Sequence, residues 1–337
     1  MRYDDRATLH NVAETVETDE GLALARVPRA VRADLNEQAR DNYRRPSGVE
    51  IRLVAEGDAR VTLSCPDGEC EVTPFWGPFQ TGPDERVTVG AEPTTVEVSF
   101  PDRLADLESD AVDEASVSPR VCRLVLRGNP TLLRGIEGET RPPRAAELPD
   151  RTYLAYGTSI TQGAVATDHP STYVAETARR VNADLLNLGT GGSAFCEPAI
   201  ADYIAGRDDW DVATLAVSVN MLAEGFTAAE FRERAVYLLE TVAGENPDRP
   251  VLAVTLFPVY PDVCSGYDDE WEATPDEYRT ALREVVADSP HANVHLAEGE
   301  ELLDDVAGLS PDLVHPTDRG MGVVAGNLAP RLAALLE

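Results

Sequence analysis

The sequence contains no lysine, so its 29 basic residues are all arginines. A P-loop nucleotide site, a protein-kinase site, a pyridoxal-phosphate Schiff base and a Ser-Lys hydrolase each require a lysine. The absence excludes these four classes of protein. A nucleophile in this chain must therefore be activated by a different base.

Long apolar runs and a cysteine framework are also missing. No stretch approaches the ~20 apolar residues of a membrane-spanning helix, and the first twenty residues lack the apolar core of a signal peptide. Five scattered cysteines are not the pattern of a disulfide-stapled domain. Cys65 and Cys70 flank a Pro-Asp-Gly turn, where we expect reduced thiols, with a hairpin-spanning disulfide as the alternative. No Cys/His cluster has zinc spacing, so we expect a cytoplasmic protein without a bound metal.

Carboxylates, in contrast, are in large excess. Sixty Asp and Glu residues against 29 arginines give a formal net charge of −31. Such a surface repels nucleic acid and anionic membranes, so we expect neither as a partner. Self-repulsion also destabilises the compact state unless salt screens it. We therefore expect a protein adapted to molar salt, as in a halophile, against the alternative of compositional drift in a GC-rich genome.

The chain changes character near residue 150, after a stretch rich in proline and charge at 139–150. Residues 1–148 begin with a helical segment around 31–42. Runs that alternate apolar and polar residues follow, with Gly, Pro and Asp between them, at 49–53, 60–63, 95–100 and 121–126. This pattern predicts an accessory β-sandwich domain, jelly-roll-like in type.

Residues 149–337 alternate short apolar runs with helical patterns. The runs at 152–156, 184–188, 212–219, 251–257 and 293–296 are typical of strands buried on both faces. Capping boxes at Thr227 and Thr274 mark the starts of two of the intervening helices. Five strands with helices between them predict an α/β domain with a five-stranded, parallel, doubly wound sheet.

Short polar motifs follow these strands in order: Gly-Thr-Ser at 157–159, Gly-Gly at 191–192, Ser-Val-Asn at 218–220 and Asp-Leu-Val-His at 312–315. In a doubly wound sheet, ligands bind beyond the carboxyl ends of the strands. We therefore expect Ser159, Gly192 and Asn220 to meet at one edge of the sheet.

Asp312 and His315 follow the fifth strand in a loop that flanking prolines keep out of helical conformation. A spacing of three lets the carboxylate reach Nδ1 of the imidazole while Nε2 faces the serine. A hydroxyl nucleophile, a base with its aspartate and a set of N–H donors are the groups that acyl transfer requires. Each motif alone also fits a turn, a helix cap or a surface ion pair, but those explanations require four independent coincidences.

The set of motifs resembles the SGNH or GDSL-type hydrolases, and the resemblance covers residues 151–337. It implies a flavodoxin-like domain, with Ser159 as nucleophile and Asp312 and His315 completing a triad. The Gly-Thr-Ser block replaces the Gly-Asp-Ser of the family, and the Asp-x-x-His block matches fully.

The resemblance further implies an oxyanion hole made by Ser159, Gly192 and Asn220. Gly191 and Gly189 are the alternatives to Gly192. The family's third block is usually Gly-x-Asn-Asp, and here both positions that flank Asn220 differ. Members with a β-sandwich ahead of the catalytic domain are known among carbohydrate esterases and acyl-transferring enzymes.

These observations predict a serine esterase that cleaves a carboxylic ester, with a short acyl or acetyl ester of a carbohydrate as the preferred substrate class and no cofactor. An acyltransferase with the same triad is one alternative. A non-catalytic carbohydrate-binding protein is the other. The aromatic residues at 257–271 are candidates for a pocket wall. Those at 75–79 are expected in the core or in an interdomain contact rather than in a sugar platform.

Overall fold

The computed structural model describes residues 1–108, 111–112, 116–265 and 271–337. Their contacts divide the chain into two compact units. The first comprises Met1–Arg29, Tyr43–Arg151 and Asn182–Asp184, and the second comprises Ala30–Asn42, Thr152–Val181 and Leu185–Glu337. The short segment 30–42 thus belongs to the second unit, although it precedes most of the first unit in the sequence.

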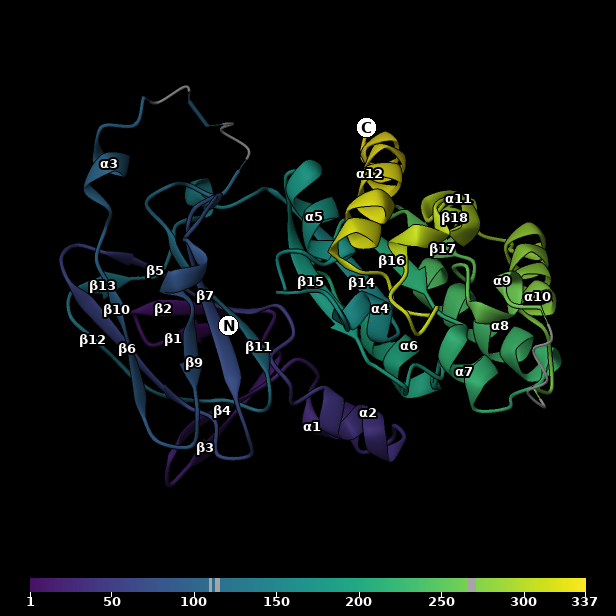
Figure 1. The fold of residues 1–337 in the computed structure, drawn as a ribbon, viewed down its shortest axis with the longest axis horizontal. Helices are drawn as coiled ribbons and strands as arrows, with labels where there is room; N and C mark the ends of the chain where they lie inside the picture. The colour runs from purple at the N-terminus through teal and green to yellow at the C-terminus, as the bar shows by residue number, and fades with distance from the viewer. Residues whose placement is uncertain (109–110, 113–115, 266–270) are drawn as a thin grey trace. The chain divides into compact units, whose positions relative to one another are not determined.

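The first unit consists of two antiparallel sheets (Figure 1). One contains β1 (Arg2–Tyr3), β2 (Ala7–His10), β5 (Val49–Ala55), β11 (Cys122–Gly128), β7 (Cys70–Trp76) and β8 (Phe79–Gln80) in that order, with β13 (Thr140–Arg141) beside β5 and β9 (Val87–Val89) beside β7. The other contains β10 (Thr94–Val98), β6 (Ala59–Ser64), β12 (Leu132–Glu137), β4 (Gly21–Ala25) and β3 (Glu14–Thr18). This unit also contains three short helical pieces outside its strands: Pro83–Glu85, α3 (Asp102–Ala105) and Ala145–Glu147.

Both sheets contribute to one hydrophobic core. Ile51 of the first sheet and Val61 and Leu63 of the second are fully buried in the same cluster of side chains. Alternate residues of β6 point inward, as the period of a strand requires. Trp76 is 6% exposed and belongs to this core, which confirms a packing role for that aromatic residue. Phe79 of the same aromatic stretch is 38% exposed and lies outside this core.

The second unit is built on a five-stranded sheet with the order β15, β14, β16, β17, β18. The strands are β14 (Arg151–Gly157), β15 (Ala183–Gly189), β16 (Val212–Ala216), β17 (Val251–Val254) and β18 (Val294–Ala297). In the sequence order of the strands this is 2-1-3-4-5, the flavodoxin-like arrangement. The predicted fold class, a parallel five-stranded α/β sheet after a β domain, is confirmed.

Helices cover both faces of this sheet (Figure 1). α5 (Tyr173–Arg180) packs with α12 (Asp318–Leu335) on one face, while α6 (Pro198–Ala205), α8 (Ala228–Glu245) and α10 (Pro275–Asp288) pack together on the other. The remaining helices are short: α1 (Arg29–Arg32), α2 (Glu37–Asn42), α4 (Ser159–Gln162), α7 (Val219–Ala223), α9 (Tyr260–Val263), α11 (Gly299–Leu302) and the 3-10 turn Val306–Gly308. The predicted capping boxes at Thr227 and Thr274 are present.

Two strands are shorter than predicted. The third ends at Ala216 rather than residue 219, because Ser218 has a φ of +110° and α7 begins directly after it. The fourth ends at Val254 rather than residue 257. Beyond it, the buried carbonyl groups of residues 256 and 257 accept hydrogen bonds from Arg279 instead of pairing with a neighbouring strand.

All five cysteines are free thiols, and four of them are buried. The expectation of reduced thiols at Cys65 and Cys70 is therefore confirmed. Burial raises the pKa of the Cys70 thiol to about 11, and the hydrogen bonds to this thiol offset only part of the effect. The thiol is therefore a packing group. Among the described residues, no helix has the length and apolar character that crossing a membrane requires.

Candidate active site

Ser159 is the first residue of α4 and follows β14 directly. The hydroxyl of Thr158 caps this helix by accepting the N–H of Ile160 at 3.4 Å. The turn depends on Gly157, where a Cβ atom would lie 2.6 Å from the carbonyl oxygen of Ala216 in the adjacent strand. The sheet therefore delivers the serine to its carboxyl edge, in the position that the sequence predicts.

Ser159, His315 and Asp312 form one hydrogen-bonded series. Ser159 Oγ lies 2.7 Å from His315 Nε2, and His315 Nδ1 lies 2.8 Å from Asp312 Oδ2. A ring nitrogen that donates to the carboxylate leaves the opposite nitrogen as an acceptor for the hydroxyl proton. The structure thus brings together three residues that are separated by as many as 156 positions in the sequence.

The Asp312 carboxylate is held ionised by its hydrogen bonds. Partial burial acts to raise its pKa. The N–H of His315 and the N–H of Val314, each 2.9 Å from Oδ1, the imidazole and the hydroxyl of Ser310 outweigh that effect and lower the pKa well below its usual range. The carboxylate therefore retains its charge beside the imidazole at neutral and mildly acidic pH.

The triad is open to solvent. The side chain of Asp312 is 46% exposed and that of His315 is 24% exposed. Ser159 itself is partly exposed, so the triad is not sealed from solvent.

Gly189 ends β15, Gly191 and Gly192 follow it, and of these three glycines Gly192 is the one whose N–H is available. The N–H of Gly189 is donated to Asn187 Oδ1 at 2.8 Å, and that of Gly191 to Gln162 Oε1 at 2.6 Å. No acceptor in the described part of the chain takes the N–H of Gly192. Gly192 has a φ of +66°, in the left-handed region that favours glycine.

Asn220 lies on α7 and is 8% exposed. Its Oδ1 accepts the N–H of Ala194 at 3.2 Å, which leaves Nδ2 on the opposite side of the amide as a donor. Within residues 1–108, 111–112, 116–265 and 271–337, no acceptor is bonded to Nδ2 of Asn220 or to the N–H of Ser159. Both groups, like the N–H of Gly192, are therefore available to a ligand.

The loop after β15 lies directly against the serine. A Cβ atom built on Gly191 would be 3.2 Å from Ser159 Cβ, and Ala194 of the same loop bonds to Asn220. Three free donors thus belong to adjacent pieces of structure around the Ser159 hydroxyl. Such a group of donors can hold an oxygen atom that gains negative charge.

Sequence reasoning missed two side chains that support the site, Asn187 and Gln162. Asn187 donates to Thr161 O at 3.0 Å and lies 3.2 Å from His169 Nε2. His169 stands in an Asp-His-Pro sequence, which predicts a surface loop, and this prediction is wrong because the residue is only 5% exposed. For Asn187, the sequence offered one signal, a polar amide inside an otherwise apolar strand. For Gln162 on α4, the sequence offered no such signal.

The predicted pocket wall at 257–271 lies partly outside the described residues, because 266–270 are not described. In the described part, Tyr260 and Trp271 pack edge to face with ring centroids 5.2 Å apart. Arg279 is buried and anchors this segment through Asp262 at 2.6 Å. The start of the segment is therefore fixed by an ion pair between an exposed aspartate and a buried arginine.

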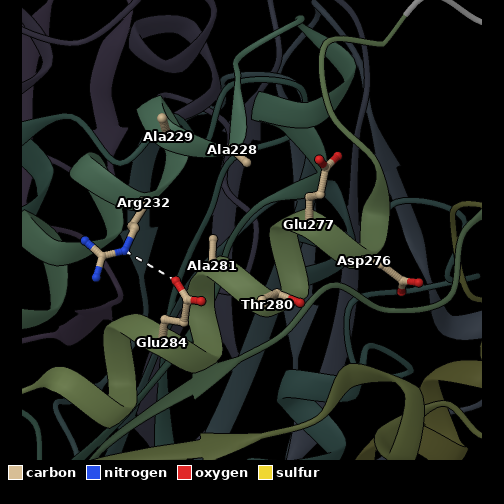
Figure 2. Close-up of a pocket in the computed structure, with 8 residues that line it drawn as sticks. All are labelled: Ala228, Ala229, Arg232, Asp276, Glu277, Thr280, Ala281 and Glu284. Carbon is tan, nitrogen blue, oxygen red and sulfur yellow. Dashed lines mark ion pairs between the residues drawn. The ribbon is translucent and has the colours of Figure 1, made fainter.

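A cavity of about 360 Å³ lies between α8 and α10. Figure 2 shows three alanines that line it, Ala228, Ala229 and Ala281. It also shows the ion pair of Arg232 with Glu284, whose charged atoms lie 3.7 Å apart. None of the predicted site residues lines it. Its lining holds no histidine or serine, and we assign it no part in the chemistry.

Solved structures with the same fold span nearly the whole chain. The salicylyl-acyltransferase SsfX3 from a tetracycline biosynthetic pathway matches with a TM-score of 0.77 at 18% identity, covering 98% of this chain and 96% of that one. A putative GDSL-like lipase from Bacteroides ovatus matches with a TM-score of 0.70 at 16% identity, covering 98% and 96%. A family two carbohydrate esterase from Clostridium thermocellum, solved with cellohexaose, matches with a TM-score of 0.59 at 17% identity, covering 85% and 92%.

At such identities the likeness concerns the fold alone. No curated protein matches the sequence. Residues 150–333, more than half of the chain, match the sequence model of one protein family. The chain therefore belongs to the GDSL-like lipase/acylhydrolase family.

Proposed function

We propose that this protein is a serine esterase that cleaves a carboxylic ester through an acyl-enzyme on Ser159. The observation that carries the proposal is the continuous hydrogen-bonded series from Ser159 Oγ through His315 to Asp312. The three free donors around the serine support it. Membership of the GDSL-like family supports ester chemistry in general.

In the proposed reaction, His315 Nε2 takes the hydroxyl proton of Ser159 as Oγ bonds to the ester carbonyl carbon. The carbonyl oxygen becomes an oxyanion, to which Ser159 N–H, Gly192 N–H and Asn220 Nδ2 donate. The imidazolium is stabilised by Asp312 and gives its proton to the leaving alcohol. Water then gives a proton to His315 as its oxygen bonds to the acyl carbon. The bond from that carbon to Ser159 Oγ breaks, His315 returns the proton to Oγ, and the acid is released.

For the substrate, we propose a short acyl ester, with acetylated carbohydrate as the preferred class. The structural neighbours include carbohydrate esterases, one of them solved with cellohexaose. The exposure of Asp312 and His315 also supports it, because an ester on a bulky carbohydrate needs an open approach to the serine.

The test is hydrolysis of p-nitrophenyl esters from acetyl to octanoyl in molar KCl by wild type and Ser159→Ala. We expect turnover by wild type that falls at least about 10³-fold in the variant, with a preference for the shortest chains. Ser289→Ala, at the C-terminal end of α10, is the matched control and should retain full activity.

Equal activity of Ser159→Ala and wild type would exclude Ser159 as the nucleophile. A folded wild type that is inactive on every ester would overturn simple ester hydrolysis. Comparison of acetylated and deacetylated xylo- and cello-oligosaccharides by mass spectrometry then tests the carbohydrate class directly.

An acyltransferase that uses the same residues is a second candidate. The observation that favours it is the match to a salicylyl-acyltransferase over 98% of this chain. Both reactions share the acyl-enzyme and differ in whether water or a bound alcohol attacks it. Product analysis with candidate acceptor alcohols decides between them, since a transferase forms the new ester faster than free acid.

A further inference from the structure

The loop that carries Gly192 is held by hydrogen bonds from the segment 36–42. Asn42 Nδ2 donates to the carbonyl oxygen of Gly191 at 2.8 Å and lies 3.1 Å from Ser193 Oγ. Gln38 Nε2 donates to the same Gly191 carbonyl at 3.0 Å. Asn42 is buried, whereas Gln38 is exposed. All these residues belong to the second unit.

The carbonyl of Gly191 shares its peptide plane with the N–H of Gly192. Because a trans peptide is planar, its C=O and N–H point in opposite directions. Ser193 Oγ adds a third hydrogen bond to this carbonyl, at 3.1 Å. Three donors on the oxygen therefore fix the direction in which the Gly192 N–H points. They also polarise the peptide, which strengthens its N–H as a donor.

The next peptide plane but one is held in the same way. Asn36 Nδ2 donates to the carbonyl of Ser193 at 2.9 Å. The N–H of the same peptide belongs to Ala194 and donates to Asn220 Oδ1 at 3.2 Å. That bond fixes the amide of Asn220 and so the direction of its Nδ2. Asn36 also caps α2, since its Oδ1 accepts the N–H of Ala39 at 3.0 Å.

We propose that Asn36, Gln38 and Asn42 are positioning residues for the oxyanion hole, which set the directions of the Gly192 N–H and of Asn220 Nδ2 through two peptide planes. The inference rests on the proposed function of the site and extends it to a segment more than 100 positions away in sequence. These side chains act through the loop, so they govern the transition state more than substrate binding.

The test compares kcat and KM for p-nitrophenyl acetate in wild type, Asn42→Asp, Gln38→Glu and Gln38→Ala. Asn42→Asp is nearly isosteric and replaces the donor with an acceptor opposite the Gly191 carbonyl. We expect kcat to fall about 10- to 30-fold in Asn42→Asp and about 3-fold in Gln38→Ala, less than the 10²–10³ of a lost donor. KM should stay within about 2-fold. Glu37→Gln, exposed on the same helix, is the matched control and should match wild type.

A second measurement separates positioning from general loss of structure. Butylboronic acid forms a tetrahedral adduct with a serine, and one of its oxygens would enter the hole. Its affinity should weaken in parallel with kcat in Asn42→Asp, while the melting temperature of Gln38→Glu stays at the wild-type value. Because Gln38 is exposed, its variants carry the test even if Asn42→Asp fails to fold.

The possible failures are distinguishable. An inactive wild type overturns the proposed function and the positioning role with it. An active wild type with unchanged kcat and boronate affinity in Asn42→Asp and Gln38→Glu overturns the positioning role alone. A fall in kcat that matches a loss of folded protein, with unchanged boronate affinity in the folded fraction, also overturns it.

Discussion

Replacement of Asn220 separates the two halves of one amide group. Oδ1 accepts the N–H of the buried Ala194, and Nδ2 is the donor proposed for the oxyanion. Asn220→Asp keeps an acceptor for Ala194 and removes the donor, whereas Asn220→Ala removes both. Both variants should therefore lose the oxyanion donor, and only Asn220→Ala should also lose the hydrogen bond to Ala194.

The magnitudes follow from these contacts. Loss of one oxyanion donor lowers kcat by about 10²–10³, or about 2.7–4 kcal/mol of transition-state stabilisation. KM should change little, because the donor strengthens its bond only as charge develops. Asn220→Ala should in addition lower the free energy of unfolding by about 1–3 kcal/mol, because the N–H of Ala194 loses its acceptor inside the protein.

The assay is steady-state hydrolysis of p-nitrophenyl acetate together with urea denaturation of each variant. Asn220→Asp with a kcat within about threefold of wild type would refute the assignment, since the donor contributes about tenfold or more wherever it acts. An unchanged stability of Asn220→Ala would refute the structural role of Oδ1. Asn293→Ala, remote from the serine at the start of β18, controls for the loss of an asparagine.

Three further perturbations test the site and the surface. Gly192→Ala should lower kcat at least about tenfold. It should also lower the melting temperature, because the new Cβ atom would lie 2.4 Å from Gln38 Nε2 and because the left-handed conformation costs an alanine about 1–2 kcal/mol. An unchanged melting temperature in calorimetry would contradict this. The folded-state pKa of Asp312 is lowered, so its contribution to stability is present above its unfolded pKa of about 3.9 and is lost as pH falls below that value. Asp312→Asn should therefore be less stable than wild type at pH 7, and denaturation curves at pH 7 and pH 3 should show the difference shrinking with acidification. A melting temperature that does not rise between 0.1 and 2 M KCl would contradict the expected screening of the net charge of −31.

The sequence predicts the parallel sheet well because strands buried on both faces are apolar runs, and the observed strands begin within one residue of the predicted ones. The positions of Ser159, Asp312 and His315 follow from the same pattern, since the ends of such strands meet at one edge. Strands of the β unit are harder to predict. β3 is mostly exposed and β7 contains Pro74, so neither has a clean alternation of apolar and polar residues.

The residues that support the site leave a weaker trace in sequence. Asn36, Gln38 and Asn42 have the composition of a solvated helix face, and only the tertiary structure shows that their amides bond to the loop at 191–193. His169 lies between Asp168 and Pro170, a composition typical of surface loops. The histidine is nevertheless buried, beside Asn187 of β15, which lies 18 positions further along the chain.

The place of the segment 30–42 affects where this chain can be divided. The family match begins at residue 150, and a shortened chain starting there would contain the triad and the glycine loop but not Asn36, Gln38 or Asn42. In the sequence, residues Ala30–Asn42 of the α/β unit therefore interrupt the β unit, whose main parts are Met1–Arg29 and Tyr43–Arg151. Exchange of these two parts between relatives, by evolution or by protein engineering, requires three junctions: one on each side of residues 30–42 and one after Arg151.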